Sequence, residues 1–249
     1  MKYPLVKRSY YFSLFKDIFN FIKKPNNNID SKKTTKQKIY DTIGLYFLKM
    51  IFLIPVVFFF AFVYDPENTQ NISMSERFSP FVFLLIGGII LPLIEEVGFR
   101  LSLNFKPIYL VLSSSVLTYY FVTKAIFHTK NTAIDESFVI RVISAVIIGL
   151  ILFLICKVNI VKEKLTQFWS AHFRSIFYIS CITFAWIHIS KYELNWANII
   201  LLPILTLPQL ISAIINGYTR VKFGFQYPLI FHMSTNLISI GLSLLPFAD

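Results

Sequence analysis

Residues 81–100 read FVFLLIGGIILPLIEEVGFR, an apolar run that ends in two glutamates and an arginine. A run of this length and hydropathy predicts a helix that crosses a membrane, and a Gly-Gly pair and a proline within it predict a kink. Charges inside a bilayer are energetically costly, so those that remain need a partner or a function. Residues four apart share a helical face, which predicts that Glu96 pairs with Arg100 while Glu95 points elsewhere.

The whole chain has the composition of a membrane protein. Of its 249 residues, 55% are hydrophobic and only 15% are charged, whereas a soluble domain carries about 25% charged residues. Seven apolar segments follow the N-terminus, which predicts an all-α fold, a polytopic bundle of about seven transmembrane helices. These segments lie at about 44–63, 80–105, 108–127, 138–156, 173–190, 197–217 and 227–247.

The N-terminal part of the chain has a different character. Residues 1–43 hold ten basic and three acidic residues, and apolar side chains recur among them at helical spacing. This pattern is typical of an amphipathic helix on an anionic membrane surface, and the Asn- and Lys-rich stretch 25–38 predicts a linker after it. The expected division is a basic cytoplasmic segment, 1–43, and a membrane-embedded domain, 44–249. The apolar positions are Phe12, Phe15, Ile18, Phe19 and Ile22.

The charge distribution predicts an orientation. The formal net charge is +11. If the N-terminus is cytoplasmic, seventeen basic residues fall in inside segments and four in outside segments. This bias places the N-terminus inside and the C-terminus outside. Because the excess lies between apolar runs, the expected partner is the lipid bilayer and not nucleic acid.

Two later apolar segments carry histidines. His188 ends the stretch Phe184-Ala185-Trp186-Ile187, and His232 is four residues before Asn236, so the last two share a helical face. All of these positions, like Glu95, fall within the thickness of a hydrocarbon core of about 30 Å. We therefore expect a carboxylate, two imidazoles and a carboxamide to line one buried polar cavity.

Three short motifs stand in order along the chain. They are Glu95-Glu96-x-x-x-Arg100, Phe184-x-x-x-His188 and His232-x-x-x-Asn236. Together they resemble the motifs of the CAAX prenyl protease and bacteriocin-processing (CPBP) family of intramembrane proteases, and residues 217–232 look like the family's approach to its last motif. The resemblance covers about residues 80–240. The first two motifs usually lie a few tens of residues apart, but here an inserted pair of spans at about 108–156 separates them and preserves their sidedness.

The resemblance implies an intramembrane endopeptidase of a bacterial cytoplasmic membrane. Its substrate would be a protein or peptide that enters from the membrane or the cytoplasmic side. Glu95 would activate a water molecule for attack on a peptide carbonyl, and His188 would position that water or carbonyl. His232 and Asn236 would donate hydrogen bonds to the developing oxyanion. The remaining motif residues, Phe184 among them, would be structural.

Alternatives to this interpretation remain open. Two imidazoles and a carboxylate also form a known catalytic zinc set, with Glu95, His188 and His232 as the ligands. The chain lacks a His-Glu-x-x-His helix, so we expect no metal and no other cofactor. A protein of the same fold could instead act without proteolysis, as a bacteriocin-immunity protein or a sensor partner. A proton-coupled transporter is the third reading, although the absence of an internal repeat disfavours it.

Overall fold

The computed structural model describes residues 4–30 and 32–245, and this part of the chain contains helices and no strands, which confirms the predicted all-α class. The longer helices are α1 (Arg8–Lys23), α2 (Thr35–Phe62), α3 (Thr69–Arg77), α5 (Leu91–Phe99), α6 (Pro107–Phe121), α7 (Phe138–Cys156), α8 (Asn159–Ala171), α9 (Phe173–Ile187), α12 (Leu207–Lys222) and α13 (Gln226–Ser243). The shorter ones are η1 (Pro4–Val6), α4 (Pro80–Leu85), η2 (Ile86–Ile90), η3 (Leu101–Leu103), η4 (Val122–Ile126), η5 (His188–Lys191), α10 (Trp196–Ile200) and α11 (Leu202–Leu205).

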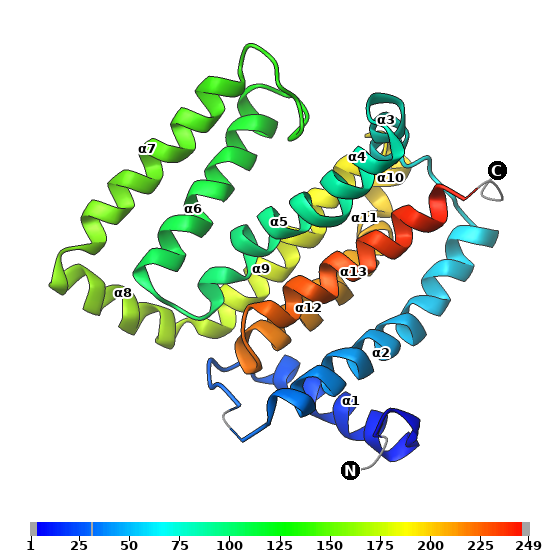
Figure 1. Ribbon diagram of the computed structural model, residues 1–249, viewed down its shortest axis with the longest axis horizontal. Helices are drawn as coiled ribbons and strands as arrows, with labels where there is room; N and C mark the ends of the chain where they lie inside the picture. Colours follow the sequence, from blue (N-terminus) through cyan, green and yellow to red (C-terminus); the bar gives the residue numbers. More distant parts are fainter. Residues whose placement is uncertain (1–3, 31, 246–249) are drawn as a thin grey trace.

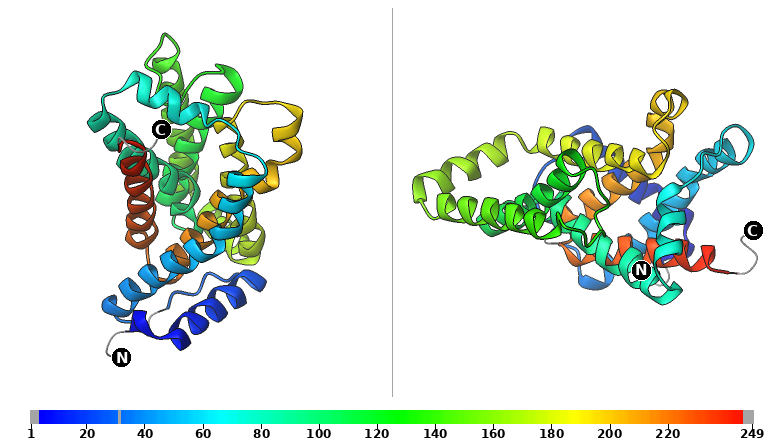
Figure 2. Two further views of the ribbon diagram at one scale, coloured as in Figure 1. Left: turned by 90° about the vertical axis from the view of Figure 1, so that its right-hand side faces the viewer. Right: turned by 90° about the horizontal axis from the view of Figure 1, so that it is seen from above.

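The helices form a main group with a pair beside it. In the main group, α12 packs against α2, α9 and α13, and α13 packs against α2 and α5. Helices α6 and α7 pack on each other and join the group where α6 meets α5 (Figure 1). Helix α1, helix α8 and the turn from α12 to α13 lie at one end of the molecule, whereas α3 and the loop before α7 lie at the other. Figure 2 shows the same arrangement from the side and from above.

Among the residues that the structure describes, four helices are long and apolar enough to cross a membrane. These are Thr35–Phe62, Pro80–Leu103, Phe138–Cys156 and Phe173–Lys191. Large apolar side chains are exposed along α2 and α7, as expected for helices that face lipid. The four helices support the predicted membrane class, but they are fewer than the seven spans expected from the sequence.

The predicted single segment at 197–217 is wrong. The chain here forms α10, α11 and the first part of α12, with breaks at Leu201 and Thr206. Pro203 and Pro208 stand in the first turns of α11 and α12. Proline lacks the amide hydrogen that would continue an incoming helix, yet it fits the first turn of a new one. The two prolines therefore divide the apolar run into short helices.

The first long helix begins earlier than the predicted boundary at residue 44. Helix α2 starts at Thr35, inside the stretch predicted as a linker. Thr34 and Gln37 form a capping box, in which each side chain accepts a hydrogen bond from the other residue's backbone amide. This arrangement satisfies amide groups that a helix start otherwise leaves unpaired. Helix α2 therefore includes residues 35–43 of the predicted N-terminal segment.

Helix α1 occupies the place predicted for an amphipathic helix. It packs against α2 and α12, with Leu14, Ile18 and Phe21 in the hydrophobic core. Three of the predicted apolar positions, Phe12, Phe15 and Phe19, stay exposed. The helix therefore has one apolar face against the bundle and a second, aromatic face directed away from it.

The predicted kink is a turn of π-helix, η2, between α4 and α5. It contains Gly87 and Gly88, which lie against α13. A Cβ atom on Gly88 would overlap Leu237, and one on Gly87 would lie 2.7 Å from Ile240 Cδ1. The two glycines thus allow η2 and α13 to approach closely. π-helical turns of this kind occur often at functional sites.

The loop before α7 is held by one buried arginine. Arg141 is fully buried, and its Nη2 atom donates to the Ala133 carbonyl at 2.6 Å and to Asp135 Oδ1 at 3.1 Å. Hydrogen bonds from the Ser137 side chain are the main reason that the pKa of Asp135 falls to about 2, and Thr129 and Arg141 contribute further. The ionised form of Asp135 is therefore favoured in the folded loop.

Stability should depend on Asp135 in acid. Because the pKa is depressed on folding, the stabilising effect is complete above the unfolded value of about 4 and is lost as the pH falls towards about 2. Thermal unfolding of wild type and Asp135→Asn should differ by a constant amount above about pH 4 and converge near pH 2. Glu136→Gln, at the exposed neighbouring position, is the control. A difference that is as large at pH 2 as at pH 7 would contradict this assignment.

Candidate functional site

The predicted site residues lie around one cavity of about 880 Å³. Its walls come from α2, α5, α6, α9, α12 and α13 and from the ends of several shorter elements. The lining includes all four residues with predicted catalytic roles, Glu95, His188, His232 and Asn236. The structure therefore brings these four groups together around one cavity.

Glu96 is the centre of the polar contacts beside this cavity. The residue is 0% exposed. Its Oε1 atom lies 3.6 Å from Arg100 Nη1, accepts a hydrogen bond from Asn216 Nδ2 at 2.9 Å and lies 2.8 Å from His232 Nδ1. The predicted pairing of Glu96 with Arg100 is confirmed, but this carboxylate also joins α5 to α12 and α13.

Arg100 is held by stacking as well as by charge. Its guanidinium lies 3.6 Å from the centre of the Phe184 ring and is almost completely buried. The same ring lies 4.6 Å from the His188 ring and 6.0 Å from the His232 ring. A cation is attracted to an aromatic face, most strongly where water is excluded. Phe184 therefore connects the three motifs through packing.

Glu95 points into the cavity, away from Arg100. Its Oε2 atom lies 3.6 Å from His232 Nε2. This separation is longer than a hydrogen bond, so the carboxylate keeps its lone pairs for another partner. The two neighbouring glutamates, although identical in chemistry, therefore have different surroundings: Glu96 is enclosed by protein groups and Glu95 lines open space.

The hydrogen bonds of the histidines determine which ring nitrogens face the cavity. His188 Nδ1 lies 2.6 Å from the Phe184 carbonyl, which can only accept a hydrogen bond. Nδ1 of His188 must therefore carry the proton, and Nε2 is left for the cavity. In His232, Nδ1 likewise faces the Glu96 carboxylate, and Nε2 is on the side of Glu95.

Asn236 is positioned by the π-helical turn. Its Nδ2 atom donates to the carbonyl of Gly87 at 3.1 Å. An amide nitrogen has two hydrogens, so one of them remains for a group in the cavity. The glycines of η2 thus permit the approach of α13 and supply a carbonyl that orients Asn236.

Other polar residues beside the cavity were not singled out in the sequence. Asn216, on α12, donates to Glu96, and Lys49 and Tyr120 line the cavity from α2 and α6. Arg220 is buried and donates to the carbonyls of Arg100 and Leu101 at the end of α5. A polar residue inside an apolar run is a sequence signal for a functional position. Lys49 and Asn216 both have this signal.

The cavity extends towards the end of the molecule that carries α3. Exposed residues of its lining include Gln70 and Asn71 on α3, Lys124 on η4, His128 in the following loop and Leu194 just after η5. Helix α1 lies at the opposite end (Figure 1). A solute would therefore reach Glu95 from the α3 end without passing the basic N-terminal segment.

The alternative zinc set does not fit this geometry. Within residues 4–30 and 32–245, no group of three or more His, Cys, Asp or Glu side chains is arranged to hold a metal ion. Glu95 and His232 are close, but His188 is joined to them only through the Phe184 ring.

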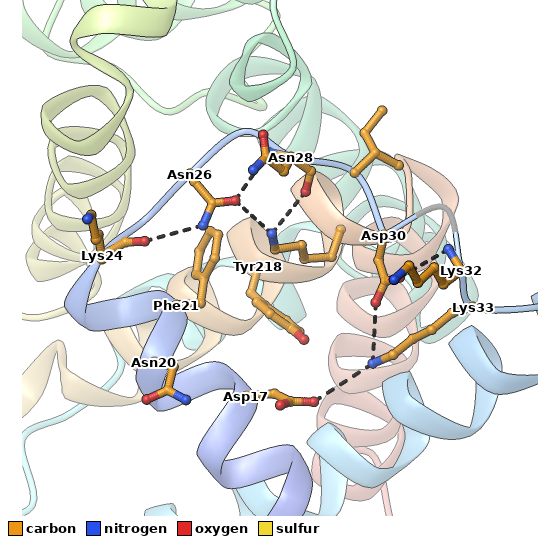
Figure 3. A pocket seen from close by; sticks show the side chains of 12 residues that line it. Asp17, Asn20, Phe21, Lys24, Asn26, Asn28, Asp30, Lys32, Lys33 and Tyr218 are labelled. Carbon is orange, nitrogen blue, oxygen red and sulfur yellow. Dashed lines mark hydrogen bonds and ion pairs between the residues drawn. The ribbon is translucent and has the colours of Figure 1, made fainter.

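A second cavity, of about 550 Å³, lies at the α1 end (Figure 3). Lys33 Nζ lies there between Asp17 and Asp30, at 3.9 and 3.8 Å, and Lys222 donates to Asn26 Oδ1 at 2.8 Å. Burial raises the pKa of Asp17, and the Lys33 ammonium opposes that rise. These contacts join the segment after α1 to α12, which indicates a structural role.

Comparisons with models of protein families, with curated proteins and with solved structures give no match for this chain.

Proposed function

We propose that this protein is an intramembrane endopeptidase that hydrolyses a peptide bond with a water molecule activated by Glu95. The observation that carries the proposal is the difference between the two glutamates. Oε1 of the fully buried Glu96 is held by Arg100, Asn216 and His232, whereas Glu95 lines the cavity and makes no hydrogen bond within the described residues. A carboxylate with free lone pairs in an enclosed cavity is suited to act as a general base. The resemblance of the three motifs to the CPBP family supports the same reaction.

The reaction follows from the positions of the groups. Glu95 takes a proton from water as the water oxygen bonds to the peptide carbonyl carbon. The resulting tetrahedral intermediate carries a negative oxygen, and collapse breaks the C–N bond while the proton passes from Glu95 to the leaving amine. His188 Nε2, left free by the Phe184 carbonyl, accepts a hydrogen bond from the water and orients it.

Asn236 and His232 act on the oxyanion. Asn236 donates its second amide hydrogen, while the Gly87 carbonyl holds the first. His232 can donate from Nε2 only when both ring nitrogens carry protons, and the Glu96 carboxylate beside Nδ1 then supplies the compensating charge. Preorganised donors of this kind stabilise charge that develops in the transition state.

The proposed membrane arrangement has seven spans with a cytoplasmic N-terminus. The four long apolar helices supply four of these spans. The other three are α6 with η4, α12 and α13. The basic segments before α2 and in α8 lie at one end of the molecule, as the charge bias requires. The C-terminus is then outside, and the cavity opens towards the outer face. This lining favours entry of the substrate from the outer face, whereas the resemblance implies entry from the membrane or the cytoplasmic side.

Cysteine labelling tests the topology. Lys36→Cys and Lys164→Cys, both at exposed positions, should react with a membrane-impermeant maleimide only after the cells are opened. Glu136→Cys, at the other end, should react in intact cells. The native Cys156 and Cys181 are buried, so wild type is the background control. Labelling of positions 36 and 136 from the same side would contradict the arrangement.

A substrate trap tests the function. Glu95→Gln protein, cross-linked in its own membranes, should retain the substrate because binding groups remain and the base is lost. Each captured protein is then incubated with purified wild type in lipid vesicles. Cleavage by wild type and not by Glu95→Gln is expected. If no captured protein is cleaved, a binding protein of the same fold becomes the better assignment.

A further inference from the structure

Lys49 is a buried cation without an acidic partner. It lies within the apolar helix α2, is 4% exposed and lines the main cavity. Its Nζ atom lies 5.3 Å from the centre of the Phe231 ring on α13. Among residues 4–30 and 32–245 it forms no ion pair and no hydrogen bond. An ionisable side chain within a membrane helix is costly unless a partner compensates it.

The cavity wall has more positively than negatively charged side chains. Lys124 and Lys191 also line the cavity, from η4 and η5, and neither forms an ion pair within the described residues. Within the described residues, Glu95 is the single carboxylate that lines the cavity. Three amines against one carboxylate leave an excess of positive charge along the cavity wall, which attracts an anion.

We propose that the cavity selects a peptide that carries a carboxylate near the bond to be cleaved, and that Lys49 is the residue that binds this carboxylate. The inference rests on the proposed peptidase function. Lys49 lies on the opposite wall from the α6–α7 pair, beside Phe231, which precedes His232 in the chain. A carboxylate on Lys49 therefore lies in the same cavity as the groups that act on the peptide bond. The carboxylate can belong to an acidic side chain or to a free C-terminus.

Matched peptides test this specificity. Three peptides share one apolar sequence: one has a central Asp and blocked ends, one has Asn in its place, and one has Asn with a free C-terminal carboxylate. Binding to purified Glu95→Gln protein in detergent is measured by fluorescence anisotropy. A hydrogen bond to a charged group predicts roughly ten- to hundredfold tighter binding of a peptide with a carboxylate. The peptide that shows the gain identifies the source of the carboxylate.

Variants at position 49 connect the preference to Lys49. In the Glu95→Gln background, Lys49→Met should abolish the preference, Lys49→Arg should retain it, and Lys36→Met, at an exposed site on the same helix, should leave it unchanged. Loss of an unpaired buried charge should not lower thermal stability, which is measured first for each variant. Equal binding of all three peptides overturns the inference, and so does a preference that survives Lys49→Met.

Hydrolysis by wild type separates this inference from the proposed function. The same peptides are incubated with wild type, and the products are identified by mass spectrometry. Cleavage without a preference for the carboxylate overturns the inference and leaves the peptidase function in place. A binding preference that depends on Lys49, without cleavage of any peptide, supports the inference as a property of the cavity and contradicts the peptidase function.

Discussion

Replacement of Glu95 by glutamine is expected to lower substrate turnover by about 10²-fold or more and to leave the folded protein intact. Glutamine keeps the shape of the side chain but cannot accept the proton of the attacking water. The fold should be unaffected because Glu95 lines the cavity, makes no hydrogen bond within the described residues and has only His232 Nε2, at 3.6 Å, as an ion-pair contact there. Initial rates of cleavage in lipid vesicles and thermal unfolding in detergent measure the two quantities.

The control for Glu95→Gln is Glu163→Gln, which removes a carboxylate from an exposed position on α8. This variant should have the turnover and the unfolding temperature of wild type. His232→Ala and Asn236→Ala should lose activity by comparable factors, because each supplies a donor to the oxyanion. Full activity of Glu95→Gln on a cleaved substrate would exclude the proposed mechanism.

The second large effect is expected on stability. Arg100→Ala should lower the free energy of unfolding by about 3–5 kcal/mol, because it leaves the buried Glu96 carboxylate without its compensating cation. The stacking of the guanidinium on Phe184 is lost at the same time. Glu96→Ala should be destabilising by a similar amount, since Arg100 and the Asn216 amide both lose their partner. Thermal or denaturant unfolding of purified variants in one detergent measures the change.

Arg174→Ala is the matched control for Arg100→Ala, since it removes an exposed arginine from α9. Its stability should be close to that of wild type. The exchange variant, Glu96→Arg with Arg100→Glu, should not recover stability, because an arginine at position 96 would face the hydrogen-bond donors Asn216 and His232. If Arg100→Ala unfolds like wild type but is inactive, Arg100 takes part in the chemistry and the structural assignment is wrong.

Two detailed predictions that the structure bears out depend on local spacing alone. The pairing of Glu96 with Arg100 follows from one helical turn, and the irregular turn at Gly87 follows from a pair of glycines. A local rule also explains why the single helix predicted at 197–217 is wrong. Two prolines divide this apolar run into short helices. A hydropathy average does not register that a single residue can end a helix.

The composition, hydropathy and residue spacing by themselves determined the helical class, the membrane character and the helix faces on which the polar motif residues lie. The tertiary structure alone decided which of those faces meet. Glu96 contacts Asn216 and His232, which lie 120 and 136 residues later in the chain. Lys49 lines the neighbouring cavity from a helix that contains none of the three motifs. Helical periodicity specifies the direction of a side chain relative to its own axis, within a few turns. The distance between two helices depends on how their side chains pack, and here on the glycines that bring η2 against α13, so those contacts have no local signature.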